Sequence, residues 1–219
     1  MPTATDTQLI SFNGWTLRAR PSQSASPRLL ALIHGWTGDE NSMWVFTRRL
    51  SRNYWMIAPR APHAVDTGGF SWRDMKDAAF GWPTFETLSS AADGLLQLID
   101  EYSASVGVDA SQFDVMGFSQ GAAMANLLGI VHPNRIRKMA VLAGFVPNGL
   151  EGFVLRKPLA GKDVFVAHGT QDQIIPLNRA HASMALLEQA GAQVTHCEEE
   201  VGHKLGTNCL RALEHYLQD

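Results

Sequence analysis

The sequence is poor in cysteine and in net charge. Only 2 cysteines, Cys197 and Cys209, occur in 219 residues, which excludes a framework of several disulfides. One pair in a chain of this size is more typical of a reducing compartment, although a single structural disulfide remains open. The formal net charge is -3, from 18 basic and 21 acidic side chains. We therefore expect no binding to nucleic acid, because the sequence has no excess of basic residues that would contact the phosphates.

Long apolar runs are also missing. No apolar run reaches the roughly 20 residues that a transmembrane helix needs, and residues 1–8 lack the basic and apolar regions of a secretory signal. We expect a cytoplasmic monomer or homodimer with no membrane insertion. The length favours a single domain over 1–219, with an N-terminal hairpin and link at 1–28 and the core at 29–219.

What the sequence does contain is a series of strand-length apolar segments that alternate with helical spacing. In most of these segments the apolar residues are consecutive, which is typical of strands covered on both faces. The segments are 29–33, 54–58, 113–116, 139–143, 164–167 and 193–197. Between them apolar residues recur at three- and four-residue steps, for example from Leu88 to Tyr102. The alternation predicts an α/β fold, with a mainly parallel central sheet and helices on both faces.

A Gly-x-Ser-x-Gly pentapeptide centred on Ser119 is the motif that carries chemistry. It follows the predicted strand 113–116 and precedes the small, apolar segment 122–130. The pentapeptide alone is weak evidence, since glycine and serine are common and a serine can simply cap a helix. A strand before it and a helix after it are the context in which such a turn holds a nucleophilic serine at the carboxyl edge of a sheet.

A serine nucleophile needs a histidine base and an acid that orients the histidine. In this type of fold the chain order is serine, acid, histidine, and Asp172 and His203 each follow a later predicted strand. Asp163 precedes its strand and would lie at the wrong edge, and His168 precedes the acid in the chain. The sequence therefore predicts Ser119, Asp172 and His203 as the catalytic residues.

Two backbone N–H groups are candidates for an oxyanion hole. Gln120 follows the nucleophile, and Trp36 lies in the loop after the early strand 29–33. Four further side chains are candidates for the wall of an acyl pocket and are equally compatible with loop packing. They are Phe70, Trp72, Met75 and Trp82. The histidines and cysteines lack the spacing of a metal site, so we expect no metal and no other cofactor.

Six segments in order along the chain resemble one known family. They are His34-Gly35 with Gly38-Asp39-Glu40, Pro59-Arg60-Ala61-Pro62, Phe70-Ser71-Trp72-Arg73-Asp74, Gly117-Phe118-Ser119-Gln120-Gly121, His168-Gly169-Thr170-Gln171-Asp172-Gln173-Ile174-Ile175-Pro176 and Gly202-His203. Together they are similar to the phospholipase/carboxylesterase branch of the α/β-hydrolase superfamily, which includes carboxylesterases and acyl-protein thioesterases. The resemblance runs from about residue 29 to the C-terminus. It implies an α/β-hydrolase fold without a large lid domain.

The resemblance also implies a function. Ser119, Asp172 and His203 would be the triad of a serine hydrolase that cleaves a small-molecule ester or thioester through an acyl-enzyme. We expect small to medium acyl groups, because Trp36 is bulkier than the residue usual in the family at that position and would narrow the pocket. The near-neutral charge predicts recognition through apolar contacts and not by a charged patch. A catalytically silent protein that binds a small ligand is the alternative, since a fold does not fix a function.

Overall fold

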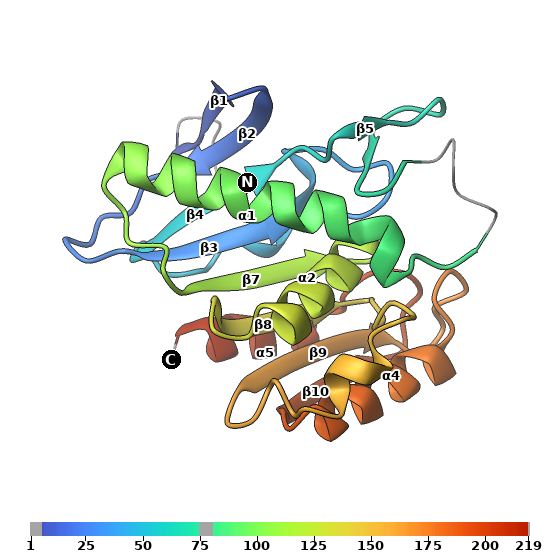
Figure 1. The fold of residues 1–219 in the computed structure, drawn as a ribbon. Helices are drawn as coiled ribbons and strands as arrows, with labels where there is room; N and C mark the ends of the chain where they lie inside the picture. The colour runs from blue at the N-terminus through green and yellow to red at the C-terminus, as the bar shows by residue number, and fades with distance from the viewer. Residues whose placement is uncertain (1–5, 75–80, 219) are drawn as a thin grey trace.

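One eight-stranded sheet forms the centre of the molecule (Figure 1). It belongs to a computed structural model that describes residues 6–74 and 81–218. The strands are β1 (Gln8–Phe12), β2 (Trp15–Arg20), β3 (Arg28–Ile33), β4 (Tyr54–Pro59), β7 (Phe113–Phe118), β8 (Ile136–Leu142), β9 (Asp163–Gly169) and β10 (Gln193–Glu199). Their order across the sheet is β1-β2-β4-β3-β7-β8-β9-β10. From β4 to β10 every neighbouring pair is parallel, which confirms the predicted mainly parallel sheet.

The N-terminal hairpin adds the two antiparallel strands of this sheet. Asn13 and Gly14 both have positive φ, 45° and 82°, as a tight two-residue hairpin turn requires. The turn brings Phe12 opposite Trp15. Strand β2 then pairs antiparallel with β4, so the hairpin extends the central sheet at one edge. A separate two-stranded sheet is formed by β5 (His63–Ala64) and β6 (Phe70–Ser71).

Helices cover both faces of the sheet, as predicted. One face packs against α1 (Phe85–Val106), α2 (Gln120–Val131) and α4 (Leu177–Gln189), which lie in front of the strands in Figure 1. The other face packs against the 3-10 helix η2 (Ser42–Phe46) and α5 (Thr207–Gln218). Strand β3 shows why both faces are apolar, because Leu29 points to the first cluster and the next residue, Leu30, points to the second. The short helix α3 (Glu151–Val154) lies between β8 and β9 in the chain.

The sequence determines where helix α1 begins and ends. Its predicted apolar stripe from Leu88 to Tyr102 is buried against the sheet. Thr84 caps the N-terminus by exchanging hydrogen bonds with Thr87, and Gly107 ends the helix in a left-handed conformation, with φ 70°. In the described part of the chain, none of the helices has the length and apolar character needed to cross a membrane.

The segment after β3 forms only the short helix η2. The side chain of Trp44 bonds to a backbone carbonyl of this segment. Its indole N–H donates to the carbonyl of Glu40 at 2.8 Å, which is the acceptor that the backbone of residue 44 would use in an α-helix.

Candidate active site

The loops that follow the parallel strands meet at one edge of the sheet. Strands β7 and β9 point the same way in Figure 1, and the carboxyl ends of β3, β7, β9 and β10 lead into the loops that carry the predicted site residues. These residues are Trp36, Ser119, Asp172 and His203. Parallel strands with crossover helices produce this convergence, because every strand ends at the same edge.

Ser119 occupies a strained turn between β7 and α2. Its φ and ψ are 56° and -117°, a region that side chains other than glycine rarely adopt. A Cβ on Gly117 would lie 2.1 Å from the carbonyl oxygen of Gly121, and a Cβ on Gly121 would lie 2.0 Å from that of Ile33. Both glycines are therefore needed so that the strand, the turn and the helix can pack this closely. The turn projects Ser119 toward the loops at the sheet edge.

Asp172 and His203 form a hydrogen-bonded pair across two loops. The Nδ1 of His203 lies 2.7 Å from Oδ2 of Asp172, whose side chain is fully buried. The other oxygen, Oδ1, accepts hydrogen bonds from the backbone N–H groups of Ile174 and Ile175 at 2.8 and 2.9 Å. The carboxylate is thus fixed on both sides. Its bond to Nδ1 leaves Nε2 of His203 as the ring nitrogen that can accept a proton.

Ser119 and His203 line the same cavity, but they are not hydrogen-bonded to each other in the described structure. Such contacts in hydrolases are often long before substrate binds and tighten in the complex. His168 precedes Asp172 in the chain and so is not the predicted base. It lies next to Asp172 in the structure. Its Nε2 is 2.9 Å from the carbonyl oxygen of Ile175 and 3.5 Å from Oδ2 of Asp172. His168 is buried and supports the acid loop from within.

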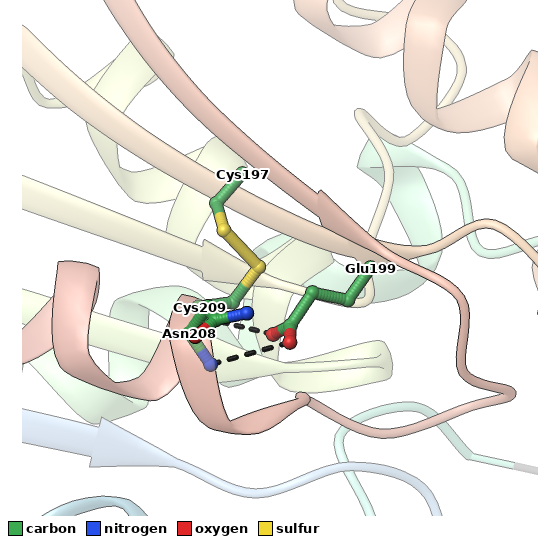
Figure 2. Close-up of a disulfide and its surroundings, with 4 residues drawn as sticks. All are labelled: Cys197, Glu199, Asn208 and Cys209. Carbon is green, nitrogen blue, oxygen red and sulfur yellow. Dashed lines mark hydrogen bonds between the residues drawn. A yellow bond between two sulfur atoms is a disulfide. The ribbon is translucent and has the colours of Figure 1, made fainter.

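A disulfide closes the loop that carries His203 (Figure 2). It joins Cys197 of β10 to Cys209 of α5, and the carboxylate of Glu199 accepts hydrogen bonds from the N–H groups of Asn208 and Cys209 at 3.2 and 2.8 Å. Both ends of the loop are therefore held. The single structural disulfide that the composition left open is therefore present, because β10 and α5 pack side by side and bring the two cysteines together.

The same residues form the one group of three potential metal ligands found among the described residues. Atoms of Cys197, Glu199 and Cys209 lie within 4.8 Å of one another. The two sulfurs are bonded to each other, whereas a metal would need thiolates. The carboxylate of Glu199 already caps the first turn of α5.

Two backbone N–H groups beside Ser119 have no acceptor within the described part of the chain. They belong to Trp36, in the loop after β3, and to Gln120, the first residue of α2. The side chain of Gln120 is turned away, because its Oε1 accepts from the N–H of Trp72 at 3.0 Å and its Nε2 donates to Ser71 at 3.1 Å. The two amides are free to hold an oxygen that develops negative charge.

His34 fixes the loop that carries the first of these amides. Its Nδ1 lies 2.7 Å from the carbonyl oxygen of Gly35, and its Nε2 accepts a hydrogen bond from the N–H of Ala61 at 3.0 Å. An accepting Nε2 must be unprotonated, so the ring is neutral with its proton on Nδ1. Burial lowers the pKa of His34, which favours the same neutral form.

Two cavities flank Ser119, and both also touch Trp36. We call the first, of about 370 Å³, the Arg73 cavity, and the second, of about 340 Å³, the His203 cavity. The Arg73 cavity is lined by Trp36, Arg73, Gly81, Trp82, Pro83, Ser119, Gln120, Phe145, Ile174 and Ile175. The His203 cavity is lined by Gly35, Trp36, Thr37, Gly38, Ser42, Met43, Val45, Phe46, Phe118, Ser119 and His203. Trp36, which is 51% exposed, is thus part of the wall of both cavities.

The four candidate wall residues fall in different places. Trp82 lines the Arg73 cavity. Trp72 is fully buried and donates its indole N–H to the carbonyl of His34 at 2.8 Å, so it stabilises the loop after β3 and does not line a cavity. Phe70 packs under the guanidinium of Arg60, 4.6 Å from its ring centre, and lines neither cavity. Met75 lies outside the described residues.

The sequence did not single out the remaining wall of the Arg73 cavity. Phe145, from the loop after β8, packs edge-on against Trp82 with ring centres 5.0 Å apart. The guanidinium of Arg179 lies over both rings, 4.2 Å from the centre of Trp82 and 4.7 Å from that of Phe145. An aromatic residue in the loop after β8, such as Phe145, is a possible sign of a cavity wall in the sequence. Its position depends on how that loop folds, which the sequence does not show.

Comparison with known proteins agrees with this geometry. A sequence model of the family described as Phospholipase/Carboxylesterase matches residues 19–219. The chain belongs to this family. It is a hydrolase of the carboxylesterase and acyl-thioesterase type, and its fold is the α/β-hydrolase fold without a large lid domain among the described residues.

Individual relatives are distant. The chain is 27% identical to an acyl-protein thioesterase 1 of Yarrowia lipolytica, over 71% of this chain and 74% of that protein. It is also 27% identical to a probable inactive carboxylesterase of Oryza sativa, over 91% and 84% of the two chains. Among solved structures, the Bacillus cereus carboxylesterase has a TM-score of 0.79 and 22% identity, covering 94% of each chain. At that identity the structural match establishes the fold alone.

Proposed function

We propose that the protein is a serine hydrolase that cleaves esters or thioesters of small to medium acyl groups through an acyl-enzyme. The observation that carries the proposal is the 2.7 Å contact between Nδ1 of His203 and the buried carboxylate of Asp172, at the edge where Ser119 occupies its strained turn. The arrangement matches the roles that acyl transfer requires of a nucleophile, a base and an orienting acid.

In the first half-reaction, Ser119 Oγ attacks the substrate carbonyl carbon while Nε2 of His203 takes its proton. Asp172 holds the histidine in the tautomer that leaves Nε2 free and stabilises the imidazolium that forms. The carbonyl oxygen becomes an oxyanion and accepts hydrogen bonds from the N–H groups of Trp36 and Gln120. His203 then donates the proton to the leaving alcohol or thiol, and the acyl group remains on Ser119.

In the second half-reaction, water repeats the sequence. His203 takes a proton from the water, which attacks the acyl carbon, and the proton passes to Ser119 Oγ as the ester bond to the enzyme breaks. The products are a carboxylic acid and the regenerated enzyme. Substrates of modest size are supported by the volumes of the two cavities, about 370 and 340 Å³.

The test is the Ser119→Ala variant with p-nitrophenyl butyrate as substrate. We expect hydrolysis to be abolished while the melting temperature and far-ultraviolet circular dichroism stay those of a folded protein. Ser90→Ala, on the exposed side of α1, is the matched control and should keep full activity. Turnover by Ser119→Ala at the rate of the original enzyme would contradict the proposal.

A catalytically silent ligand-binding protein is the competing function, and one relative described as probably inactive makes it worth testing. Labelling with a fluorophosphonate separates the two. An active serine hydrolase becomes covalently labelled at Ser119, and the labelling is lost in Ser119→Ala. A silent protein would stay unlabelled although it is folded.

A further inference from the structure

Arg73 is the one charged residue among the described residues that line the Arg73 cavity. Most of the remaining wall is apolar and includes Trp82, Phe145 and Ile175. A cation in an apolar cavity beside the nucleophile is unexpected for a site that binds its substrate through apolar contacts alone. The near-neutral charge of the chain gave no sign of it, because net charge does not report where a single cation is placed.

One donor atom of the Arg73 guanidinium is unsatisfied. Its Nε is fully buried and has no hydrogen-bond partner. Among the residues that the structure describes, no carboxylate lies within ion-pair distance of Arg73. Burial lowers the pKa of Arg73, yet an arginine remains charged in proteins. An unpaired, partly buried charge is costly, and an anion that enters the cavity would offset that cost.

The position of Arg73 is tied to the nucleophile turn. The hydroxyl of Ser71 donates to the carbonyl of Arg73 at 2.8 Å and accepts from its N–H at 3.2 Å. The same hydroxyl accepts from Nε2 of Gln120 at 3.1 Å. Gln120 directly follows Ser119, so the backbone of Arg73 is held at a fixed place relative to the reacting serine.

The division of the site into two cavities indicates which part of the substrate meets Arg73. His203 must donate its proton to the leaving group, so the leaving group lies on the side of the His203 cavity. Ser119 and Trp36 line both cavities, whereas His203 lines only one of them. The acyl group therefore extends into the Arg73 cavity.

We infer that the acyl group of the preferred substrate carries a carboxylate, which Arg73 binds, so that the enzyme is selective for half-esters or half-thioesters of dicarboxylic acids. This inference rests on the proposed function of Ser119 and His203. Arg73 is a specificity-determining residue, because a guanidinium can donate two parallel hydrogen bonds to a carboxylate. Hydrolysis consumes one water, breaks the acyl C–O or C–S bond and releases a dicarboxylate with an alcohol or thiol.

The first test compares two esters that differ only in charge, mono(4-nitrophenyl) adipate and its methyl ester. We expect kcat/KM for the anionic ester to exceed that for the neutral ester by about tenfold or more, as a charge-assisted hydrogen bond allows. Arg73→Gln should lower this ratio by at least about tenfold, and Arg73→Lys should retain part of it. Arg211→Gln, on the exposed side of α5, is the control and should leave the ratio unchanged.

A second pair of esters places the anion on the leaving group. For 4-(butanoyloxy)benzoate and its methyl ester, we expect no preference that depends on Arg73. A ratio for the adipate pair that is the same in Arg73→Gln and the original enzyme would overturn the inference. A preference that depends on Arg73 but occurs only with the benzoate pair would overturn the assignment of the acyl side. Circular dichroism and the melting temperature establish that each variant is folded.

A binding measurement separates failure of this inference from failure of the proposed function. Adipate is titrated by calorimetry into Ser119→Ala and into the double variant Ser119→Ala/Arg73→Gln. We expect the dissociation constant to rise at least about tenfold in the double variant. If p-nitrophenyl butyrate is not hydrolysed but adipate binding depends on Arg73, the proposed function fails and the anion site stands. If hydrolysis depends on Ser119 and adipate binding ignores Arg73, this inference fails.

Discussion

Asp172 holds His203 by a single contact of 2.7 Å while two backbone amides hold the other oxygen of the same carboxylate. The pair joins two loops that are 31 residues apart in the chain. The carboxylate accepts every one of these hydrogen bonds, so its ability to accept on the side of His203 sets the tautomer of the ring.

Asp172→Asn should therefore impair catalysis more than folding. The amide oxygen can still accept from the N–H groups of Ile174 and Ile175, but the NH₂ group then faces Nδ1 of His203 and favours the wrong tautomer. By analogy with the same change in a serine protease triad, we expect kcat to fall by roughly 10³–10⁴-fold. The measurement is hydrolysis of p-nitrophenyl butyrate together with thermal unfolding.

Asp163→Asn is the matched control, since this exposed aspartate lies at the opposite end of β9. It should leave kcat within about twofold of the original value, as expected for a surface change. Equal losses in the two variants would show that Asp172 has no special role.

The proposed catalytic residues and the proposed substrate cavity differ in how far the sequence predicts them. The turn at Ser119 and the loops of Asp172 and His203 follow from local motifs and from the rule that parallel strands end at one edge. The cavity wall depends on contacts between distant segments, such as Gln120 with Ser71 across 49 residues. Ser71 also holds the backbone of Arg73. The segment 70–74 resembles the family, but that resemblance does not show that Arg73 lines a cavity.

The pairing of the two cysteines is a second feature that the sequence alone does not predict. Composition alone is more typical of a reducing compartment and leaves a single disulfide open, because a count of cysteines does not say how far apart they lie in the fold. The pairing of Cys197 with Cys209 results from the packing of α5 beside the edge strand β10, and this packing is a property of the whole sheet.

The disulfide should stabilise the fold and the loop of His203 together. Its two cysteines are separated by 12 residues, and closing a loop of that size in the unfolded chain corresponds to about 3 kcal/mol. We expect the double variant Cys197→Ser/Cys209→Ser to lose a free energy of unfolding of that order in urea titrations. Its kcat should also fall, because both ends of the loop around His203 become looser.

Dithiothreitol supplies the control for this prediction. It should lower the stability of the original protein and leave the double variant unaffected. The chemical premise is checked with a thiol reagent in guanidinium, where the unreduced protein should show no reactive thiol. Two reactive thiols would mean that the cysteines are not paired.

His34 should make the fold sensitive to acid. Burial lowers the pKa of His34 below its ordinary value of 6.5, so the unfolded chain takes up this proton first as the pH falls. The contribution of neutral His34 is fully present above about pH 6.5 and decreases as the pH falls toward the folded-state pKa. Protonation at Nε2 would remove the acceptor of the Ala61 N–H.

The measurement is the difference in free energy of unfolding between the original protein and His34→Asn, taken in urea from pH 8 to pH 5. This difference should shrink as the pH falls. His215→Asn, on the exposed side of α5, is the comparison and should show a small difference at every pH. A gap for His34→Asn that is constant with pH would contradict the neutral, buried state.

Trp36 should control the length of acyl chain that the site accepts. Trp36 is half exposed and lines both cavities, whereas its proposed contribution to the oxyanion hole is a backbone N–H that alanine also supplies. Trp36→Ala removes a bulky side chain from the lining of both cavities and should enlarge the space beside Ser119. We therefore expect the ratio of kcat/KM for p-nitrophenyl octanoate to that for p-nitrophenyl butyrate to rise by about tenfold, since one or two added methylenes in an apolar pocket are worth about 1–3 kcal/mol. Leu155→Ala, which truncates an exposed side chain outside both cavities, should keep the original ratio. An unchanged ratio in Trp36→Ala would mean that another residue limits the chain length, and Trp82 or Phe145 would be the next wall to truncate.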